Sequence, residues 1–243
     1  MTEKKTFIFR GRDLLVNAAL EPADVQASSV IAEYTDLVSG NTGIAVSQDF
    51  TCPEGTVFLS LREYFASRDE EKAAMAARMK GLTEWRKVTN FCTCCGKGLK
   101  AHTKENAMVC PECGHVHYPR ISPCVIAVIR KGKDILLLRH RQRNQDIFAC
   151  LAGFVETGET LEQALQREVR EETGLEICNI RYAGSQSWPF PDQLMLGFYA
   201  DYKSGSIKVQ EDEIIEAGWF PSDKLPATPR AGSISYKLIH FEL

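Results

Sequence analysis

The sequence lacks three features that would mark particular classes of protein. Its hydrophobic runs all fall well short of the about 18 residues needed to cross a membrane, so we expect no transmembrane helix. It also has little net charge, because 29 basic and 32 acidic side chains leave −3 over 243 residues. This balance argues against binding nucleic acid through bulk positive charge, although a local basic patch remains compatible with it. The first residues show neither a long apolar run nor a small-residue cleavage site, so we expect no signal peptide and a cytoplasmic location.

Cysteine, in contrast, is abundant. An odd count of nine in a chain without an export signal disfavours a disulfide framework, and five of the nine lie between positions 92 and 113. Two CxxC pairs separated by fourteen residues can direct four thiolates at one ion, which predicts a closed, structural zinc site. The predicted ligands are Cys92, Cys95, Cys110 and Cys113. Free buried thiols, a redox CxxC, or substitution of a ligand by His115 or His117 are the alternatives.

Hydrophobic periodicity divides the chain into three regions. Short β-like runs separated by turn residues mark residues 1 to about 66, and residues 68–88 are predicted to form a helix leading into the cysteine cluster. From residue 123 onward the pattern is mixed. There we predict strands at 124–129, 135–138, 194–202 and 217–220, and helices at 161–172 and 234–241.

The predicted helix at 161–172 carries acids where its core-facing residues should continue. Leu161, Ala164 and Leu165 define an apolar face, and Glu168 and Glu172 extend the same face, with Glu171 beside them. They also lie at the helix C-terminus, where the macrodipole disfavours negative charge. Divalent cations bound by the carboxylates would relieve this repulsion, whereas a solvated helix end is the alternative.

The segment from Gly153 to Leu175 resembles the Nudix box, GX5EX7REUXEEXGU, at every specified position. The resemblance implies hydrolysis of a nucleoside diphosphate linked to another group, with Mg2+ or Mn2+ on the helix carboxylates. It implies that Glu168 and Glu172 bind metal, together with the carbonyl of Ala152. Glu171 is expected to bind metal or to orient a water molecule. Glu159 is expected to pair with Arg167 and to hold the preceding loop against the helix.

A second motif, Ser185-Gln-Ser-Trp-Pro-Phe-Pro-Asp-Gln-Leu-Met195, follows the box. By itself it predicts a stiff aromatic loop, either a packed turn or a platform for a planar ligand. It resembles the SQPWPFPxS signature of the NADH pyrophosphatases, which also carry a zinc ribbon before the Nudix domain; Ser187 and Gln193 depart from that signature. The resemblance implies an α+β protein with three domains. They are an N-terminal mixed α/β domain (1–88), a zinc ribbon (89–121) and a Nudix α/β/α sandwich (122–243).

The same resemblance implies further site residues. Glu213 matches a metal-binding glutamate beyond the box, with a solvated turn as the alternative. Tyr118 and Phe154 match aromatics that stack on the nicotinamide side. Ser235 lies where a backbone contact to substrate is expected, and Arg62 is a candidate contact from the first domain. The residues expected to line the substrate pocket are Gln186, Ser187, Trp188, Pro189, Phe190, Pro191, Asp192 and Gln193.

The activity implied is hydrolysis of NADH or NAD+ to nicotinamide mononucleotide and AMP, with removal of NAD caps from RNA as a further reaction at the same bond. The family is typically homodimeric, and no membrane partner is expected. One alternative is a broader Nudix hydrolase of ADP-ribose or dinucleoside polyphosphates. An alternative of another class is a zinc-ribbon nucleic-acid-binding protein with an inactive Nudix fold.

Overall fold

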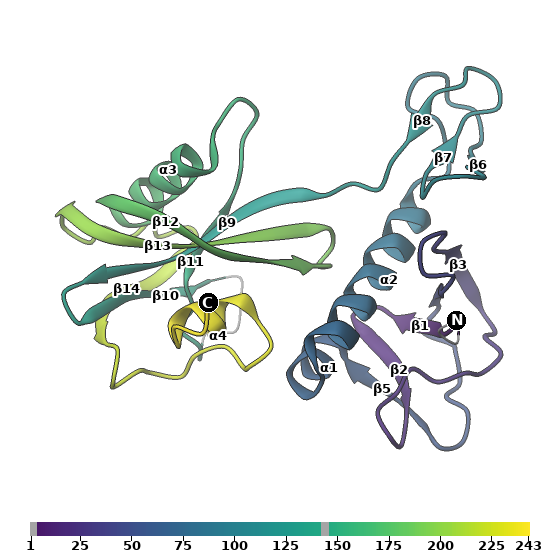
Figure 1. The fold of residues 1–243 in the computed structure, drawn as a ribbon, viewed down its shortest axis with the longest axis horizontal. Coiled ribbons are helices and arrows are strands. Elements are labelled where there is room, and N and C mark those ends of the chain that lie inside the picture. Colours follow the sequence, from purple (N-terminus) through teal and green to yellow (C-terminus); the bar gives the residue numbers. More distant parts are fainter. Residues whose placement is uncertain (1–3, 142–145) are drawn as a thin grey trace. The chain divides into compact units, whose positions relative to one another are not determined.

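The computed structural model describes residues 4–141 and 146–243, which form two compact units (Figure 1). The N-terminal unit comprises Met1–Ile121 together with Ser187–Asp192, and the C-terminal unit comprises Ser122–Gln186 and Gln193–Leu243. Helices and strands are both well represented, and strands predominate, so the fold is mixed α+β as predicted. In the part of the chain that the structure describes, no helix combines the length and the apolar character needed to cross a membrane.

The N-terminal unit is built on a five-stranded sheet of order β3-β4-β1-β2-β5. Its strands are β1 (Thr6–Arg10), β2 (Asp13–Asn17), β3 (Val30–Thr35), β4 (Thr42–Val46) and β5 (Thr56–Ser60). Strands β1 and β4 are parallel and the other pairs are antiparallel. Because side chains alternate along a strand, Phe7 and Phe9 pack against the helices that follow, whereas Ile8 lies in a second core on the opposite face.

Two helices, α1 (Leu61–Ser67) and α2 (Glu70–Val88), follow this sheet. Asp69 caps α2, since its carboxylate accepts a hydrogen bond from the backbone N–H of Lys72 at 2.9 Å. The chain then forms a small antiparallel sheet of β6 (Lys100–Ala101), β7 (Met108–Val109) and β8 (Val116–His117). Met108 of this ribbon packs in one buried cluster with Leu82 and Trp85 of α2.

A buried carboxylate links the ribbon to the rest of the N-terminal unit. Asp36 is fully buried and accepts two hydrogen bonds of 2.8 Å from the guanidinium of Arg78. The amide of Asn106, in the ribbon, donates a third hydrogen bond to Asp36 at 2.6 Å. Burial alone would raise the pKa of Asp36, but these donors and Ser39 hold it well below its usual value. The ribbon is therefore fastened by polar as well as apolar contacts.

The C-terminal unit contains a six-stranded mixed sheet of order β12-β13-β9-β10-β14, with β11 paired to β9. Its strands are β9 (Ser122–Lys131), β10 (Asp134–His140), β11 (Leu151–Phe154), β12 (Leu175–Trp188), β13 (Gln193–Gly205) and β14 (Ile214–Pro221). Strand β9 is nearly all buried, consistent with its central place between β10, β11 and β13.

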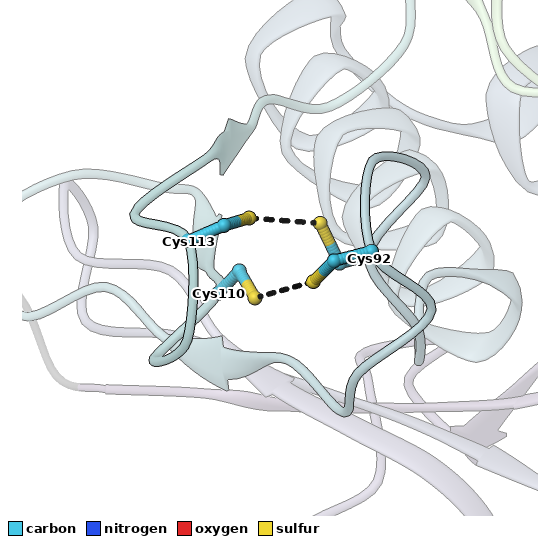
Figure 2. A group of neighbouring side chains, drawn as sticks. Cys92, Cys110 and Cys113 are labelled. Carbon is cyan, nitrogen blue, oxygen red and sulfur yellow. Dashed lines mark hydrogen bonds between the residues drawn. The ribbon is translucent and has the colours of Figure 1, made fainter.

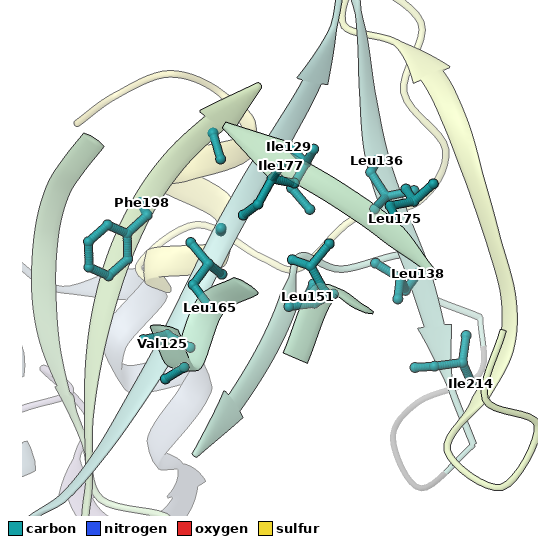
Figure 3. Close-up of a cluster of buried hydrophobic side chains, with 14 residues drawn as sticks. Val125, Ile129, Leu136, Leu138, Leu151, Leu165, Leu175, Ile177, Phe198 and Ile214 are labelled. Atoms are coloured by element: carbon teal, nitrogen blue, oxygen red, sulfur yellow. The ribbon is translucent and has the colours of Figure 1, made fainter. Parts of the chain in front are cut away.

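One helix covers each face of this sheet. Val125, Ala127 and Phe198 face α3 (Leu161–Thr173) in the main apolar core (Figure 3). Gly197, the neighbour of Phe198 on β13, instead faces α4 (Ile234–Ile239), whose Ile234 and Leu238 side chains lie 3.0 and 3.3 Å from the position of an added Cβ. Because successive strand residues point to opposite faces, α3 and α4 enclose the sheet, which is the predicted α/β/α sandwich.

The predicted elements are present, with several additions and shifted boundaries. The region of β-like runs predicted to reach about residue 66 ends earlier, because α1 begins at Leu61, and the helix predicted from residue 68 begins at Glu70. The last helix ends at Ile239 rather than at residue 241. Strand β12 was not predicted, because apolar and polar residues do not alternate regularly along its fourteen residues, as they do in a half-buried strand.

Candidate active site and zinc site

Helix α3 begins at Leu161 as predicted and ends at Thr173, one residue beyond the predicted end. Thr160 and Gln163 form a reciprocal capping box, in which the Thr160 hydroxyl accepts from the Gln163 N–H at 3.2 Å and the Gln163 side chain accepts from the Thr160 N–H at 2.9 Å. Gly174 ends the helix in the left-handed region, with φ of 69°. These two caps set which residues occupy the last two turns, where the acids lie.

Arg167 connects the acids of this helix to the loop before it. Its Nε donates to Glu159 at 2.6 Å, and its Nη1 donates to both Glu168 and Glu171 at 2.9 Å. Its Nη2 donates to the backbone carbonyl of Phe154 at 2.9 Å. The hydrogen bond from Arg167 lowers the pKa of Glu159, and the three carboxylates raise that of Arg167. The predicted Arg167–Glu159 pair therefore forms, and Arg167 also connects β11 to two acids of α3.

The Glu168 carboxylate lies directly against the backbone of Gly153 in β11. A Cβ at Gly153 would be 1.8 Å from the Glu168 Cδ and little more than 2 Å from either of its oxygens. Only a glycine leaves room for this contact. The burial of Glu168 raises its pKa, and the charges of Glu171 and Glu213 raise it further, against the opposing effect of Arg167. Burial and the neighbouring acids therefore disfavour the charged form of Glu168, and Arg167 favours it.

The other predicted metal ligands lie close to this helix end but differ in exposure. Glu172 is buried, with 3% of its surface exposed, whereas Glu171 and Glu213 are exposed. Ala152 lies on β11 beside Gly153, paired with Ile126 of β9. Hard divalent cations prefer such oxygen donors, so the donor set fits them. Among the described residues, however, only the four cysteines bring three or more ligand atoms within 4.8 Å of one another.

Those four cysteines converge in the ribbon, as predicted (Figure 2). The Sγ atoms of Cys92 and Cys113 are 3.6 Å apart, and those of Cys95 and Cys110 are 3.4 Å apart. Tetrahedral zinc with Zn–S bonds of about 2.3 Å requires S···S separations of about 3.8 Å, so the cluster has the dimensions of a zinc site.

Both knuckles have the same backbone geometry. In each, the N–H of the following glycine donates to the carbonyl of the first cysteine, at 2.9 Å for Gly96 and 3.0 Å for Gly114. Both glycines have φ near +70°, a conformation that other residues rarely adopt. His117 and the backbone N–H groups of the first knuckle lower the pKa of the Cys92 thiol to about 5, which favours the thiolate form.

The aromatic loop predicted to line the substrate pocket packs within the N-terminal unit. Trp188 and Phe190 are in edge contact with ring centroids 5.1 Å apart, and Phe65 of α1 lies 5.8 Å from Trp188. The guanidinium of Arg62 lies 5.7 Å from the Trp188 ring and 5.3 Å from the Phe190 ring. The structure therefore brings Arg62 and the loop together. The sequence did not single out Phe65, which offers no motif of its own.

Two further predicted substrate residues, Tyr118 and Asp192, also have partners in the N-terminal unit. The Tyr118 ring is exposed, and its hydroxyl donates to Glu105 at 2.7 Å, which raises the pKa of the phenol. Asp192 pairs with Arg120 at 3.3 Å. Glu105 was missed by the sequence, since a single acid between two cysteine pairs carries no signal of its own.

The remaining predicted residues lie in the C-terminal unit. Phe154 is half exposed at the end of β11, so its ring is available for stacking. Ser235 is buried on α4, and its hydroxyl accepts from the backbone N–H of Cys150 at 3.4 Å. The Gln186 side chain bonds the backbone of Gly232 and of Ile234, which the sequence did not anticipate. Gln193, at the start of β13, pairs in register with residue 122 of β9.

Comparison with known proteins gives consistent matches. The NUDIX domain matches residues 119–240. The chain is 43% identical to the NAD-capped RNA hydrolase NudC of Pseudomonas aeruginosa, over 78% of this chain and 68% of that protein. It is 45% identical to the NAD-capped RNA hydrolase NudC of Haemophilus influenzae, over 75% and 72% respectively. A solved NUDIX hydrolase from Nitrosomonas europaea is 24% identical, with a TM-score of 0.49, covering 56% of this chain and 80% of that one.

Proposed function

Because the chain belongs to the Nudix family, whose enzymes generally need divalent metals, we propose that it hydrolyses the pyrophosphate bond of NADH or NAD+ to nicotinamide mononucleotide and AMP. Water adds to one phosphorus, the bond from that phosphorus to the bridging oxygen breaks, and the bridging oxygen leaves with the other nucleotide. The same reaction on a longer substrate removes an NAD cap from RNA, the activity in the names of the relatives from Pseudomonas and Haemophilus.

One observation carries this proposal most directly. Arg167 donates hydrogen bonds to Glu159, Glu168 and Glu171 and to the Phe154 carbonyl of β11, and the Glu168 carboxylate lies against Gly153 of the same strand. Crowded carboxylates with a raised pKa at Glu168 favour a bound cation. Such a cation, Mg2+ or Mn2+, would neutralise phosphate charge and activate water for attack. The proposed ligands are the backbone carbonyl of Ala152 and the carboxylates of Glu168, Glu172 and Glu213. Glu171 is proposed to bind metal or to orient a water molecule.

The proposed substrate contacts follow the family resemblance. Phe154 and Tyr118, whose rings are both exposed, are proposed to stack on the nicotinamide side. The backbone of Ser235 is proposed to contact the dinucleotide, and the loop from Ser187 to Gln193 to line the pocket, with Arg62 as a further contact. Aromatic rings supply stacking area at low entropic cost, which suits a substrate with planar bases.

The four cysteines are proposed to hold a structural Zn2+, because a closed set of four thiolates leaves no open coordination position for chemistry. We further propose the domain limits 1–88, 89–121 and 122–243, a homodimeric assembly, and action in the cytoplasm on dinucleotides and NAD-capped RNA. Sedimentation of the zinc-loaded protein tests the assembly.

The decisive experiment incubates the purified protein with NADH, NAD+, ADP-ribose and NAD-capped RNA, each with Mg2+ or Mn2+, and resolves the products by mass. Release of nicotinamide mononucleotide and AMP from NADH or NAD+ is the expected result. Faster turnover of ADP-ribose would instead support a broader Nudix hydrolase. Turnover of none, with tight binding of RNA, would support a binding module. Glu172→Gln should abolish turnover with unfolding unchanged.

A further inference from the structure

Gln186 lies near the end of strand β12, directly before the aromatic loop Ser187–Asp192, and both ends of its side-chain amide bond within the protein. Its Nε2 donates to the backbone carbonyl of Gly232 at 2.8 Å. Its Oε1 accepts from the backbone N–H of Ile234 at 2.7 Å. Both distances are at the short end of the normal range for N–H···O hydrogen bonds. The two ends of one amide therefore hold a segment, Gly232 to Ile234, that lies nearly fifty residues further along the chain.

The chemistry at this point suits an amide. The Gly232 carbonyl needs a donor and the Ile234 N–H needs an acceptor, and the amide of glutamine presents both on one planar group without carrying a charge. The Ile234 N–H is at the first position of α4, where it has no partner within the helix. Gly232 has φ of 85°, so the chain turns sharply into the helix between the two bonded groups.

The segment that Gln186 fastens is also bonded on its other side. The Ser235 hydroxyl accepts from the backbone N–H of Cys150 at 3.4 Å, and the Cys150 thiol donates to the Ser235 carbonyl at 3.7 Å. Cys150 directly precedes β11, the strand that carries Ala152 and Gly153. Residues 232–235 are therefore bonded to Cys150, which precedes the strand of the proposed ligand Ala152, and to Gln186, which precedes the aromatic loop.

We propose that Gln186 is a positioning residue, which holds residues 232–235 so that the backbone at Ser235 meets the dinucleotide, rather than a residue that binds the substrate itself. This inference rests on the proposed function, in which Ser235 supplies a backbone contact. It assigns to Gln186 a role different from that of the aromatic loop beside it. Both partners of its amide belong to the chain itself, so the segment is held by protein groups.

The test compares Gln186→Leu, which removes both hydrogen bonds, with Gln186→Glu, which keeps the acceptor for Ile234 and loses the donor for Gly232. Gln166→Leu, the same change at an exposed position of α3, is the matched control. Steady-state hydrolysis of NADH gives KM and kcat, and hydrogen exchange of the ligand-free protein gives the protection of the Ile234 amide. Thermal unfolding confirms that each variant is folded.

For Gln186→Leu we expect KM to rise about tenfold with kcat within about threefold, since a contact made equally in ground and transition states is weakened. Protection of the Ile234 amide should fall at least about tenfold. Gln186→Glu should retain most of that protection and lie between the wild type and Gln186→Leu in KM. The Gln166→Leu control should match the wild type in both measurements.

Three outcomes would overturn the inference while leaving the proposed function standing. A raised KM with unchanged Ile234 protection would mean that Gln186 touches the substrate directly. Lost protection with unchanged KM would mean that residues 232–235 lie outside the substrate site. No change in either would mean that Gln186 has no role in the site. Failure of the proposed function is recognised separately, because the wild type would then not hydrolyse NADH.

Discussion

The substitution Gly153→Ala examines the contact on which the proposed metal site depends. The added Cβ would lie 1.8 Å from the Glu168 Cδ, whereas carbon atoms in contact prefer about 3.5–4.0 Å. Either the carboxylate or strand β11 must therefore move by about 2 Å. A displacement of about 1 Å at a reacting centre can cost about 100-fold in rate, so we expect kcat/KM to fall by at least about 100-fold. That loss corresponds to about 2.7 kcal/mol of transition-state stabilisation.

The assay is the initial rate of NADH hydrolysis at saturating Mn2+ or Mg2+, with thermal unfolding measured in parallel. We expect Gly153→Ala to lose about 1–3 kcal/mol of stability through overpacking. The double variant Gly153→Ala with Glu168→Ala should recover most of that stability and remain inactive, because the clashing carboxylate is gone.

Gly81→Ala supplies the matched control. This glycine lies within α2, and an added Cβ there would meet nothing within 4 Å. Activity should be unchanged and stability should rise by about 0.5–1 kcal/mol, the usual advantage of alanine in a helix. If Gly153→Ala kept kcat/KM within about threefold of the wild type, the contact with Glu168 could not be what positions the acids.

Three further predictions follow from other contacts. Arg167→Met should lower kcat at least about tenfold and reduce the thermal stability. The reason is that its hydrogen bonds to three glutamates and to the Phe154 carbonyl of β11 are lost together. A variant with wild-type kinetics would show that these bonds do not contribute to catalysis. We expect native mass spectrometry to detect one zinc per chain. Removal of zinc by a chelator, or Cys95→Ser, should abolish that zinc and shift the fluorescence of Trp85, which packs in one cluster with ribbon residue Met108; a full zinc content in Cys95→Ser would contradict the four-cysteine site. Since the folded-state pKa of Asp36 is lowered, its contribution to stability is present above the unfolded pKa of about 3.9 and is lost as the pH falls below it. Asp36→Asn should therefore cost at least about 2 kcal/mol at pH 7 and progressively less in acid, and an equal loss at pH 7 and pH 3 would refute this reasoning.

How much of the site could be predicted depended on the distance along the chain between its parts. The zinc ligands are local, since each CxxC pair forms its own turn, and both turns have the expected geometry at Gly96 and Gly114. The capping box of α3 and the Arg167–Glu159 pair are local as well, so their residue types and spacing sufficed. Short and half-exposed elements were the ones missed, as with α1 and β12, because tertiary packing rather than periodicity defines them.

The sequence by itself determined the family and predicted which acids carry the chemistry, because nine residues at set positions in and around one helix match the Nudix box. Only the tertiary structure decided how these residues are held. It places Glu168 of α3 against a glycine of strand β11, Arg62 beside the rings of Trp188 and Phe190, and the Gln186 amide on the backbone at the start of α4. These contacts join residues far apart in the chain, and they follow from how strands and helices pack rather than from any local pattern.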